Sequence, residues 1–470
     1  MNENVIGRVA EKKLLNRLFN SKKSEFIAVY GRRRVGKTFL IREFFDDKIV
    51  FQASGLANSG TSEQLKSFFQ PIKRYDVSAE KMPEDWLDAF DLLISYLTKL
   101  NVARKVIFLD ELPWMDTPNS GFLSALEHFW NGWASARKDI LLIVSGSATS
   151  WMMNNLILNH GGLYGRLTQK IHLQPFDLNE TDYFLKTKHI NLTKYELAEC
   201  YMILGGIPYY LDFLDKSLSL AQNIDRMIFN PNGELYREFD IVYSSLFRSK
   251  ELYIKIVETL SKKVSGLTRN DIITAAKLKS GSALTTVLSD LENCGFIQKY
   301  NVLKSQNNAI YQLADFFTIF HFRFVVKSSF YNLQFWSNIQ RTPEFYVWAG
   351  YSFEMLVMKN IEKIKQKLGI QGVRADIYAW RSKTSDPGAQ IDLVIDRQDN
   401  TINLCEIKFS ESEYLITKAY DKVLRNKISA FITETKARKS IQLTFISTYG
   451  LKRNEYSSIA QNEVMLDDLF

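Results

Sequence analysis

The segment Gly31 to Thr38, which reads GRRRVGKT, constrains the fold of this chain more than any other feature. It meets the pattern G-x-x-x-x-G-K-[ST], follows the apolar run 26–30 and precedes 39–45, which has the composition of the first turns of a helix. A strand, a loop and a helix in this order gather backbone N–H groups and the positive end of a helix dipole around phosphate oxygens. The segment therefore predicts a phosphate-binding loop in an α/β domain with a doubly wound parallel sheet.

The residue types of the loop have separate expected parts in holding a nucleoside triphosphate. Gly31 and Gly36 allow dihedral angles that a side chain would forbid. Lys37 would reach the β- and γ-phosphates, and the Thr38 hydroxyl would ligate Mg²⁺. A basic turn that happens to contain glycines is the alternative, and the agreement of eight positions and both flanks weighs against it. We expect the whole loop to bind the cofactor: Gly31, Arg32, Arg33, Arg34, Val35, Gly36, Lys37 and Thr38.

Two carboxylates follow a second strand. The apolar run 106–109 leads directly into Asp110 and Glu111, as a buried parallel strand with acids at its carboxyl end would. We expect Asp110 to hold Mg²⁺ through water and Glu111 to polarise the attacking water as a general base. The alternative is a strand that ends in a solvated acidic turn.

A third strand, 140–144, ends beside a small hydroxyl. Ser145 or Ser147 would lie next to the γ-phosphate and sense the nucleotide state, with a slight preference for Ser147. Further along, Arg166 offers a cation that would stabilise charge on the transferring phosphoryl group, in the same subunit or in a neighbour. A neighbour would make the protein a homo-oligomer, whereas an exposed structural arginine is the alternative.

The order of these motifs resembles the archaeal-type ATPases of the AAA+/STAND group. After the phosphate loop come VIFLDELPW, LLIVSGSATSWM and LYGRLTQKIHLQPF, and then LGGIPYYL at 204–211, whose G-G-x-P element marks the lid region in that group. The resemblance covers about the first 240 residues and implies an ATP-dependent switch or motor with ATP and Mg²⁺ as cofactors. It implies no particular substrate, and the lid arginine of that group has no clear counterpart here.

Composition bounds the rest of the chain. Its 470 residues, 46% hydrophobic and 24% charged, predict about three folded domains. No run reaches the roughly 18 apolar residues of a spanning helix, and Met1 to Asn4 lacks the parts of a signal peptide, so we expect no membrane partner and a cytoplasmic location. The net charge of +8 permits DNA binding without requiring it. The three cysteines, expected as buried thiols, have no metal-ligand spacing: Cys200, Cys294 and Cys405.

Motif changes divide the chain into an expected P-loop ATPase core at 1–180, a helical lid and connector at 181–248, and two further domains. The range 249–325 predicts a small winged helix-turn-helix domain, because short amphipathic helices precede two strands. Its third helix, 282–293, would expose Ser282, Thr285, Thr286, Ser289 and Asp290. Since these include no Arg or Lys, a structural or protein-binding role is the alternative to reading DNA.

The last domain, at 340–470, carries charges within apolar strands. Strand period two puts Glu406 and Lys408 on one face, and antiparallel pairs whose numbers sum to 798 would put Asp392 opposite Glu406. Two carboxylates about 5 Å apart repel unless a cation lies between them. The pattern therefore predicts a divalent metal ion.

Asp followed by Glu-x-Lys resembles the PD-(D/E)XK nuclease core, which is an α/β restriction-endonuclease-like domain. The resemblance implies that Asp392 and Glu406 bind Mg²⁺, that Lys408 orients or activates water, and that the helix acid of that family is matched by Glu354. Gln390 stands where relatives often carry an acid.

Together the two resemblances predict an ATP hydrolase whose nucleotide state controls a DNA-processing domain, a possible Mg-dependent deoxyribonuclease. The alternative is a STAND-type signalling switch with an inert carboxyl-terminal domain that binds DNA or protein.

Overall fold

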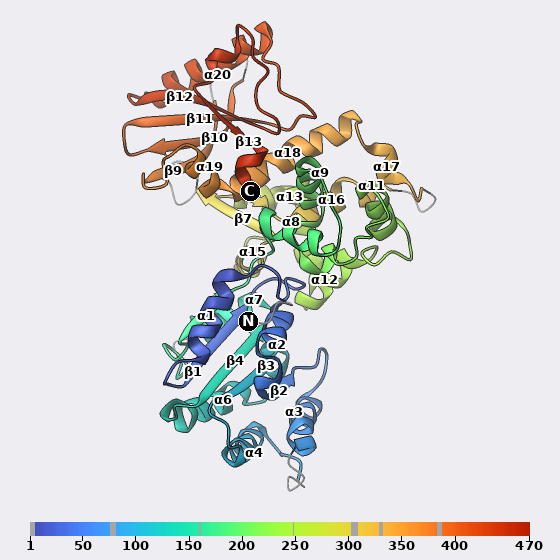
Figure 1. Ribbon diagram of the computed structural model, residues 1–470, viewed down its shortest axis with the longest axis vertical. Coiled ribbons are helices and arrows are strands. Elements are labelled where there is room, and N and C mark those ends of the chain that lie inside the picture. The colour runs from blue at the N-terminus through green and yellow to red at the C-terminus, as the bar shows by residue number, and fades with distance from the viewer. Residues whose placement is uncertain are drawn as a thin grey trace.

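The computed structural model describes residues 5–75, 81–158, 161–247, 249–301, 309–328, 332–382 and 388–470. The amino-terminal sheet lies at one end of the molecule and the carboxyl-terminal sheet at the other, with a largely helical part between them (Figure 1). The expectation about a signal peptide rests on Met1 to Asn4, which lie outside the described residues. Within those residues, no helix is both long and apolar enough to cross a membrane.

The amino-terminal sheet has five parallel strands in the order β2, β3, β4, β1, β5. Every residue of β3 and β4 is buried, because helices cover both faces of the sheet, and this explains their uninterrupted apolar runs. The carboxyl ends of the strands meet at one edge, which also receives the phosphate loop. The strands are β1 (Glu25–Tyr30), β2 (Ile49–Ser54), β3 (Lys105–Asp110), β4 (Ile140–Gly146) and β5 (Gln169–His172). The helices are α1 (Val9–Phe19), α2 (Lys37–Phe45), α3 (Thr61–Tyr75), α4 (Trp86–Lys99), α5 (Leu112–Met115), α6 (Phe122–Gly132) and α7 (Thr149–Trp151).

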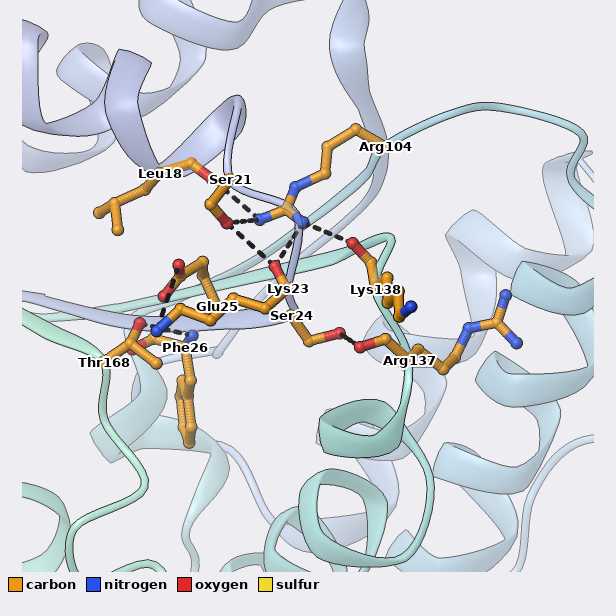
Figure 2. A network of polar contacts seen from close by, with 10 residues as sticks. All are labelled: Leu18, Ser21, Lys23, Ser24, Glu25, Phe26, Arg104, Arg137, Lys138 and Thr168. Atoms are coloured by element: carbon orange, nitrogen blue, oxygen red, sulfur yellow. Dashed lines mark hydrogen bonds and ion pairs between the residues drawn. The ribbon is translucent and has the colours of Figure 1, made fainter.

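Arg104 ties together the opposite edge of this sheet, where the strands begin (Figure 2). Its guanidinium donates to the carbonyls of Leu18 at 2.9 Å and Lys23 at 2.7 Å, on either side of the turn that leads into β1. It also donates to the carbonyl of Lys138 at 3.0 Å, just before β4. One side chain thus fixes the entries of β1, β3 and β4, which keeps their carboxyl ends aligned for a site.

Five α-helices follow, and we call this group the lid after its expected role: α8 (Leu178–Thr187), α9 (Lys194–Leu204), α10 (Pro208–Leu211), α11 (Leu220–Ile224) and α12 (Glu238–Leu246). A later helix, α17 (Phe335–Ile339), packs on this group. Asp225 accepts from the backbone N–H groups of Trp336 at 2.6 Å and Ser337 at 3.0 Å, which holds α17 against α11. The lid therefore includes a segment that sequence order alone would assign elsewhere.

The middle of the chain contains α13 (Lys250–Ser261), β6 (Leu267–Thr268), α14 (Arg269–Ala275), α15 (Ser282–Asn293), β7 (Ile297–Asn301) and β8 (Ala309–Leu313), followed by α16 (Phe316–Arg323). The strands form an antiparallel sheet in the order β6, β8, β7. The bounds of α15 are those expected from the sequence, but Asp290 is half-buried and accepts from the Tyr253 hydroxyl at 2.6 Å, so it is not on the exposed face. The winged helix-turn-helix assignment stays a prediction.

The carboxyl-terminal sheet is mixed, in the order β13, β12, β11, β10, β9. In the β10–β11 hairpin Leu393 pairs with Cys405 and Asp396 with Ile402, so the expected register is confirmed. The elements are α18 (Pro343–Lys359), α19 (Ile361–Lys367), β9 (Ala375–Arg381), β10 (Gln390–Arg397), β11 (Thr401–Lys408), α20 (Lys418–Thr435), β12 (Ser440–Ser447) and β13 (Asn462–Met465). All three cysteines are buried free thiols. Whether this domain is related to nucleases stays a prediction.

Candidate functional site

A cavity of about 450 Å³ lies at the carboxyl edge of the amino-terminal sheet. One end is formed by the phosphate loop with Glu111 and Ser147, and the other by the first described residues and the lid. Its volume is in the range of small-molecule sites. The residues at the second end are mainly apolar or aromatic, and include Val5, Ile6, Phe176, Phe184, Pro208 and Tyr209.

Lys37 is buried at the polar end of this cavity. Its Nζ donates to the carbonyls of Gly31 at 2.9 Å and Arg32 at 3.0 Å, and to Ser147 Oγ at 3.0 Å. Burial lowers the pKa of Lys37, because the site removes water from the ammonium. The contact with Ser147 favours this residue over Ser145 as the serine that would lie next to the γ-phosphate.

Thr38 and Asp110 form the second part of the polar end. Thr38 Oγ1 donates to Asp110 Oδ2 at 2.8 Å. The other carboxylate oxygen accepts from the Ser145 hydroxyl and from the backbone N–H of Glu111 at 3.1 Å. A hydroxyl and a carboxylate side by side are the oxygen ligands that Mg²⁺ prefers, so these two residues fit the expected ion.

Glu111 lies between β3 and α5 in the left-handed region, with φ of 50°. A residue other than glycine is uncommon there. Its carboxylate accepts from Ser147 Oγ at 2.5 Å and from the Ser147 backbone N–H at 3.0 Å. Lys37, Ser147 and Glu111 thus form one chain of hydrogen bonds, which connects the expected phosphate-binding ammonium with the expected general base.

The three arginines of the loop have different surroundings. Arg32 pairs with Asp315, and Arg34 donates to both carboxylate oxygens of Glu238, each at 2.8 Å. Both guanidinium groups are thus held by other parts of the chain, and whether Arg32 and Arg34 contact the nucleotide through their backbone stays a prediction. Only Arg33 lines the cavity without a carboxylate partner in the described part of the chain.

Arg166 lies in an exposed turn before β5 and is not among the residues that line the cavity. The structure thus gives no support to a role of Arg166 at the phosphates of its own subunit. A role in a neighbouring subunit stays a prediction.

The predicted residues of the carboxyl-terminal domain form one cluster. Asp392 Oδ2 accepts from the backbone N–H of Ile407 at 3.1 Å, and Glu354 on α18 faces Asp392 closely enough for the two charges to interact. Lys408 Nζ lies 2.7 Å from Glu406 Oε1. Glu354, Asp392, Glu406 and Lys408 therefore come together as the sequence predicted.

Two further residues of the cluster were missed by sequence reasoning. Lys427 Nζ donates to Glu406 Oε2 at 2.6 Å, and the Tyr420 hydroxyl donates to Oε1 at 2.5 Å. Glu406 therefore has two ammonium neighbours, Lys408 and Lys427. Tyr420 and Lys427 are seven residues apart, hence on one face of α20, and this spacing is the signal that could have revealed them.

The charges of the cluster are unevenly balanced. Burial and the charge of Asp392 raise the pKa of Glu354 to about 8, and burial and the charge of Glu406 raise the pKa of Asp392 to about 6. Burial also acts to raise the pKa of Glu406, but Lys408 and Lys427 outweigh it and hold that pKa below its usual value. Glu406 is thus the ionised member, and the other two carboxyls lack a cation of their own.

The expected metal ion does not fit this arrangement as it stands. Both oxygens of Glu406 are occupied by ammonium and hydroxyl donors. Across the ranges that the structure describes, no three His, Cys, Asp or Glu side chains are grouped to hold a metal ion. We therefore derive no chemical step through a metal ion in this domain.

Two proteins of Methanocaldococcus jannaschii are similar in sequence. The chain is 25% identical over 422 residues to the uncharacterized protein MJECL04, a match that covers 86% of this chain and 88% of the relative. It is 45% identical over 49 residues to the uncharacterized ATP-binding protein MJ0423, which covers 10% of this chain and 83% of the relative.

Among solved structures, the chain matches the Walker-type ATPase of Pyrococcus abyssi with a TM-score of 0.47 and 17% identity over 68% of this chain and 97% of the other. The ORC2 protein of Aeropyrum pernix has a TM-score of 0.42 and 14% identity, covering 72% of this chain and 96% of the other. Residues 6–214 match the model of a family described as an ATPase domain predominantly from Archaea. The matched part of the chain, which is similar to that family, holds the phosphate loop, Asp110, Glu111 and Ser147.

Proposed function

We propose that the protein binds ATP with Mg²⁺, hydrolyses it, and uses its nucleotide state to control the carboxyl-terminal domain. The observation that carries the proposal is the chain of hydrogen bonds from Lys37 through Ser147 to Glu111 at one end of the cavity. The match of residues 6–214 to an ATPase domain family supports it. The apolar end of the cavity has the character that a purine ring and a ribose require.

Each residue of the polar end then has a role. Thr38 and Asp110 would hold Mg²⁺, which neutralises charge on the β- and γ-phosphates when bound. Lys37 would exchange its contacts with loop carbonyls for phosphate oxygens. Ser147 would donate to the γ-phosphate, and Glu111, released from Ser147, would accept the proton of the attacking water.

Release of inorganic phosphate from ATP in the presence of Mg²⁺ is the direct test. The native protein should show turnover. Ser147→Ala removes the hydroxyl that donates to Glu111, so it should change both the rate of phosphate release and the position of the Glu111 side chain. Absence of ATP binding by the native protein would refute the proposal.

For the carboxyl-terminal domain we propose DNA processing, because Glu354, Asp392, Glu406 and Lys408, the residues on which the nuclease resemblance rests, lie in one cluster. A second candidate is an inert domain that binds DNA or protein. Lys427 favours this candidate, since it occupies the carboxylate oxygen of Glu406 that a metal ion would need.

One experiment separates the two candidates. The pure protein is incubated with plasmid, single-stranded and branched DNA, with and without ATP and with Mg²⁺ or Mn²⁺. Cleavage that disappears in Asp392→Asn supports DNA processing. Binding without cleavage in every condition supports the second candidate. Whether the active form is a homo-oligomer is read from sedimentation in the same conditions.

A further inference from the structure

Two arginines of the phosphate loop reach distant parts of the chain. Arg32 pairs with Asp315, the residue directly before α16, and its guanidinium carbon lies 5.1 Å from the ring centroid of Phe296. Arg34 binds Glu238 of α12 through two hydrogen bonds of 2.8 Å. The partners are 283 and 204 residues away in sequence. The two ion pairs therefore connect the loop to both the lid and the middle of the chain.

The Arg32–Asp315 pair is buried, and in the Arg34–Glu238 pair the acid is buried while Arg34 is 17% exposed. The side chains of Asp315 and Glu238 are 3% and 1% exposed, and that of Arg32 is 8% exposed. Removing one partner of a buried pair leaves an uncompensated charge, so such a pair does not open as a surface pair does.

Each acid also accepts hydrogen bonds from a second residue. Asp315 Oδ2 accepts from the Thr318 hydroxyl at 2.6 Å and from the Thr318 backbone N–H at 2.9 Å, and Glu238 accepts from the Tyr210 hydroxyl at 3.0 Å. A change in the loop must therefore either displace α12 and α16 or break these contacts.

The α16 side of this connection continues to the carboxyl-terminal cluster. The Lys359 ammonium lies 4.7 Å from the ring centroid of Phe316, the first residue of α16. Lys359 is the last residue of α18, and Glu354 of the cluster lies on the same helix. This helix contacts both α9 of the lid and β11, and it lies at the boundary between the middle helices and the carboxyl-terminal sheet (Figure 1).

Arg32 connects the expected phosphate-binding lysine with α16 through its backbone and its side chain. The Arg32 carbonyl accepts from Lys37 Nζ at 3.0 Å, while its side chain holds Asp315. A bound triphosphate would draw the Lys37 ammonium to its own oxygens. The residue that loses this contact is the one that anchors α16.

We propose that Arg32 and Arg34 are positioning residues that couple the occupancy of the nucleotide site to the placement of α12, α16 and α18, and thereby to Glu354. The inference rests on the proposed function and names how the carboxyl-terminal domain is regulated. Coupling of this kind is reciprocal, so a ligand of the carboxyl-terminal cluster would change the ATP affinity by the same factor.

The test is amide hydrogen exchange on the full chain, with and without a non-hydrolysable ATP analogue and Mg²⁺. In the native protein the analogue should change exchange in the loop and also in the segments 316–323 and 351–359. Asp315→Asn keeps the side-chain shape and removes the charge, so it should still bind the analogue but lose the change at 351–359. Its analogue affinity should shift by about 5- to 150-fold, the usual size of coupling between sites.

The matched control is Asp182→Asn, which removes an exposed ion pair with Lys186 on α8 and should keep the native exchange pattern. The inference is overturned if native protein binds the analogue without a change at 316–323 and 351–359, or if Asp315→Asn retains that change. Should Asp315→Asn fail to fold, the native measurement still decides, and Glu238→Gln tests the second pair through exchange in α12. A native protein that binds no analogue would instead refute the proposed function.

Discussion

Replacement of Glu354 by glutamine tests the electrostatics of the carboxyl-terminal cluster. Burial and the nearby Asp392 raise the pKa of Glu354 from 4.5 to about 8. The folded state therefore holds this proton more tightly than the unfolded chain does. The contribution of Glu354 to the free energy of unfolding is fully present below about pH 4.5 and is lost as the pH rises through 8.

The expected size follows from the same values. One pKa unit corresponds to about 1.4 kcal/mol, so a rise from 4.5 to about 8 amounts to about 5 kcal/mol at high pH. This figure is a ceiling for Glu354, because its field is shared with Asp392, whose pKa is raised to about 6. Glu354→Gln carries no titrating group, so it should gain stability over the native protein as the pH rises from 5 to 9.

The measurement is the opening free energy from amide hydrogen exchange in β10 and β11, at several pH values, for both proteins. Glu362→Gln on α19 serves as the control, because that side chain is 70% exposed and pairs only with Lys365 in the described residues. A difference between native protein and Glu354→Gln that is the same at pH 5 and pH 9 would refute the electrostatic reasoning, as would a gain equal to that of the control.

Four further outcomes are expected. Lys37→Ala should weaken ATP binding and remove turnover, since its ammonium is the one buried within the loop, and undiminished phosphate release would contradict the assignment. Glu111→Gln should bind ATP with a nearly native Kd but hydrolyse it about 10²-fold or more slowly in single-turnover assays; an equal loss of binding would show that its role is different. Lys427→Ala frees an oxygen of Glu406, so calorimetric titration should show tighter Mn²⁺ binding than in the native protein, and unchanged affinity would argue against the lysine as the obstacle. If Arg166 completes a neighbouring site, turnover per subunit should rise with protein concentration, whereas constant turnover with a monomer in sedimentation would exclude it.

Local rules made much of this structure predictable. The phosphate loop and the two acids at the end of β3 are each formed by contiguous residues. Few other kinds of site contain glycines, a lysine and carboxylates in that order. The β10–β11 register could be worked out because a short hairpin fixes it, and with it the approach of Asp392 to Glu406. The bounds of α15 followed from a turn at Gly281 and an apolar face that repeats with the helical period.

Contacts between distant residues could not be predicted in this way. No local pattern marks Asp315 or Glu238 as a partner of the loop, because each also satisfies an ordinary expectation for its place, a helix cap and a first-turn acid. The second lysine at Glu406 comes from α20, whose position over β11 depends on the packing of the whole domain. These side chains change the interpretation of the site, since the guanidinium groups of Arg32 and Arg34 are paired with carboxylates of other elements and both oxygens of Glu406 already accept hydrogen bonds.

The three consecutive arginines show why charge in a motif does not identify its ligand. The pattern of a phosphate loop prescribes glycines, a lysine and a hydroxyl, and leaves the intervening side chains free. In an irregular loop, successive side chains point in different directions, and Arg34, with φ of 76°, departs from the backbone that its neighbours would continue. Its planar group meets Glu238 with two parallel hydrogen bonds, which a lysine cannot reproduce. The requirement for arginine at this position thus comes from Glu238 of α12, while the proposed phosphate site would depend on Lys37 and backbone amides.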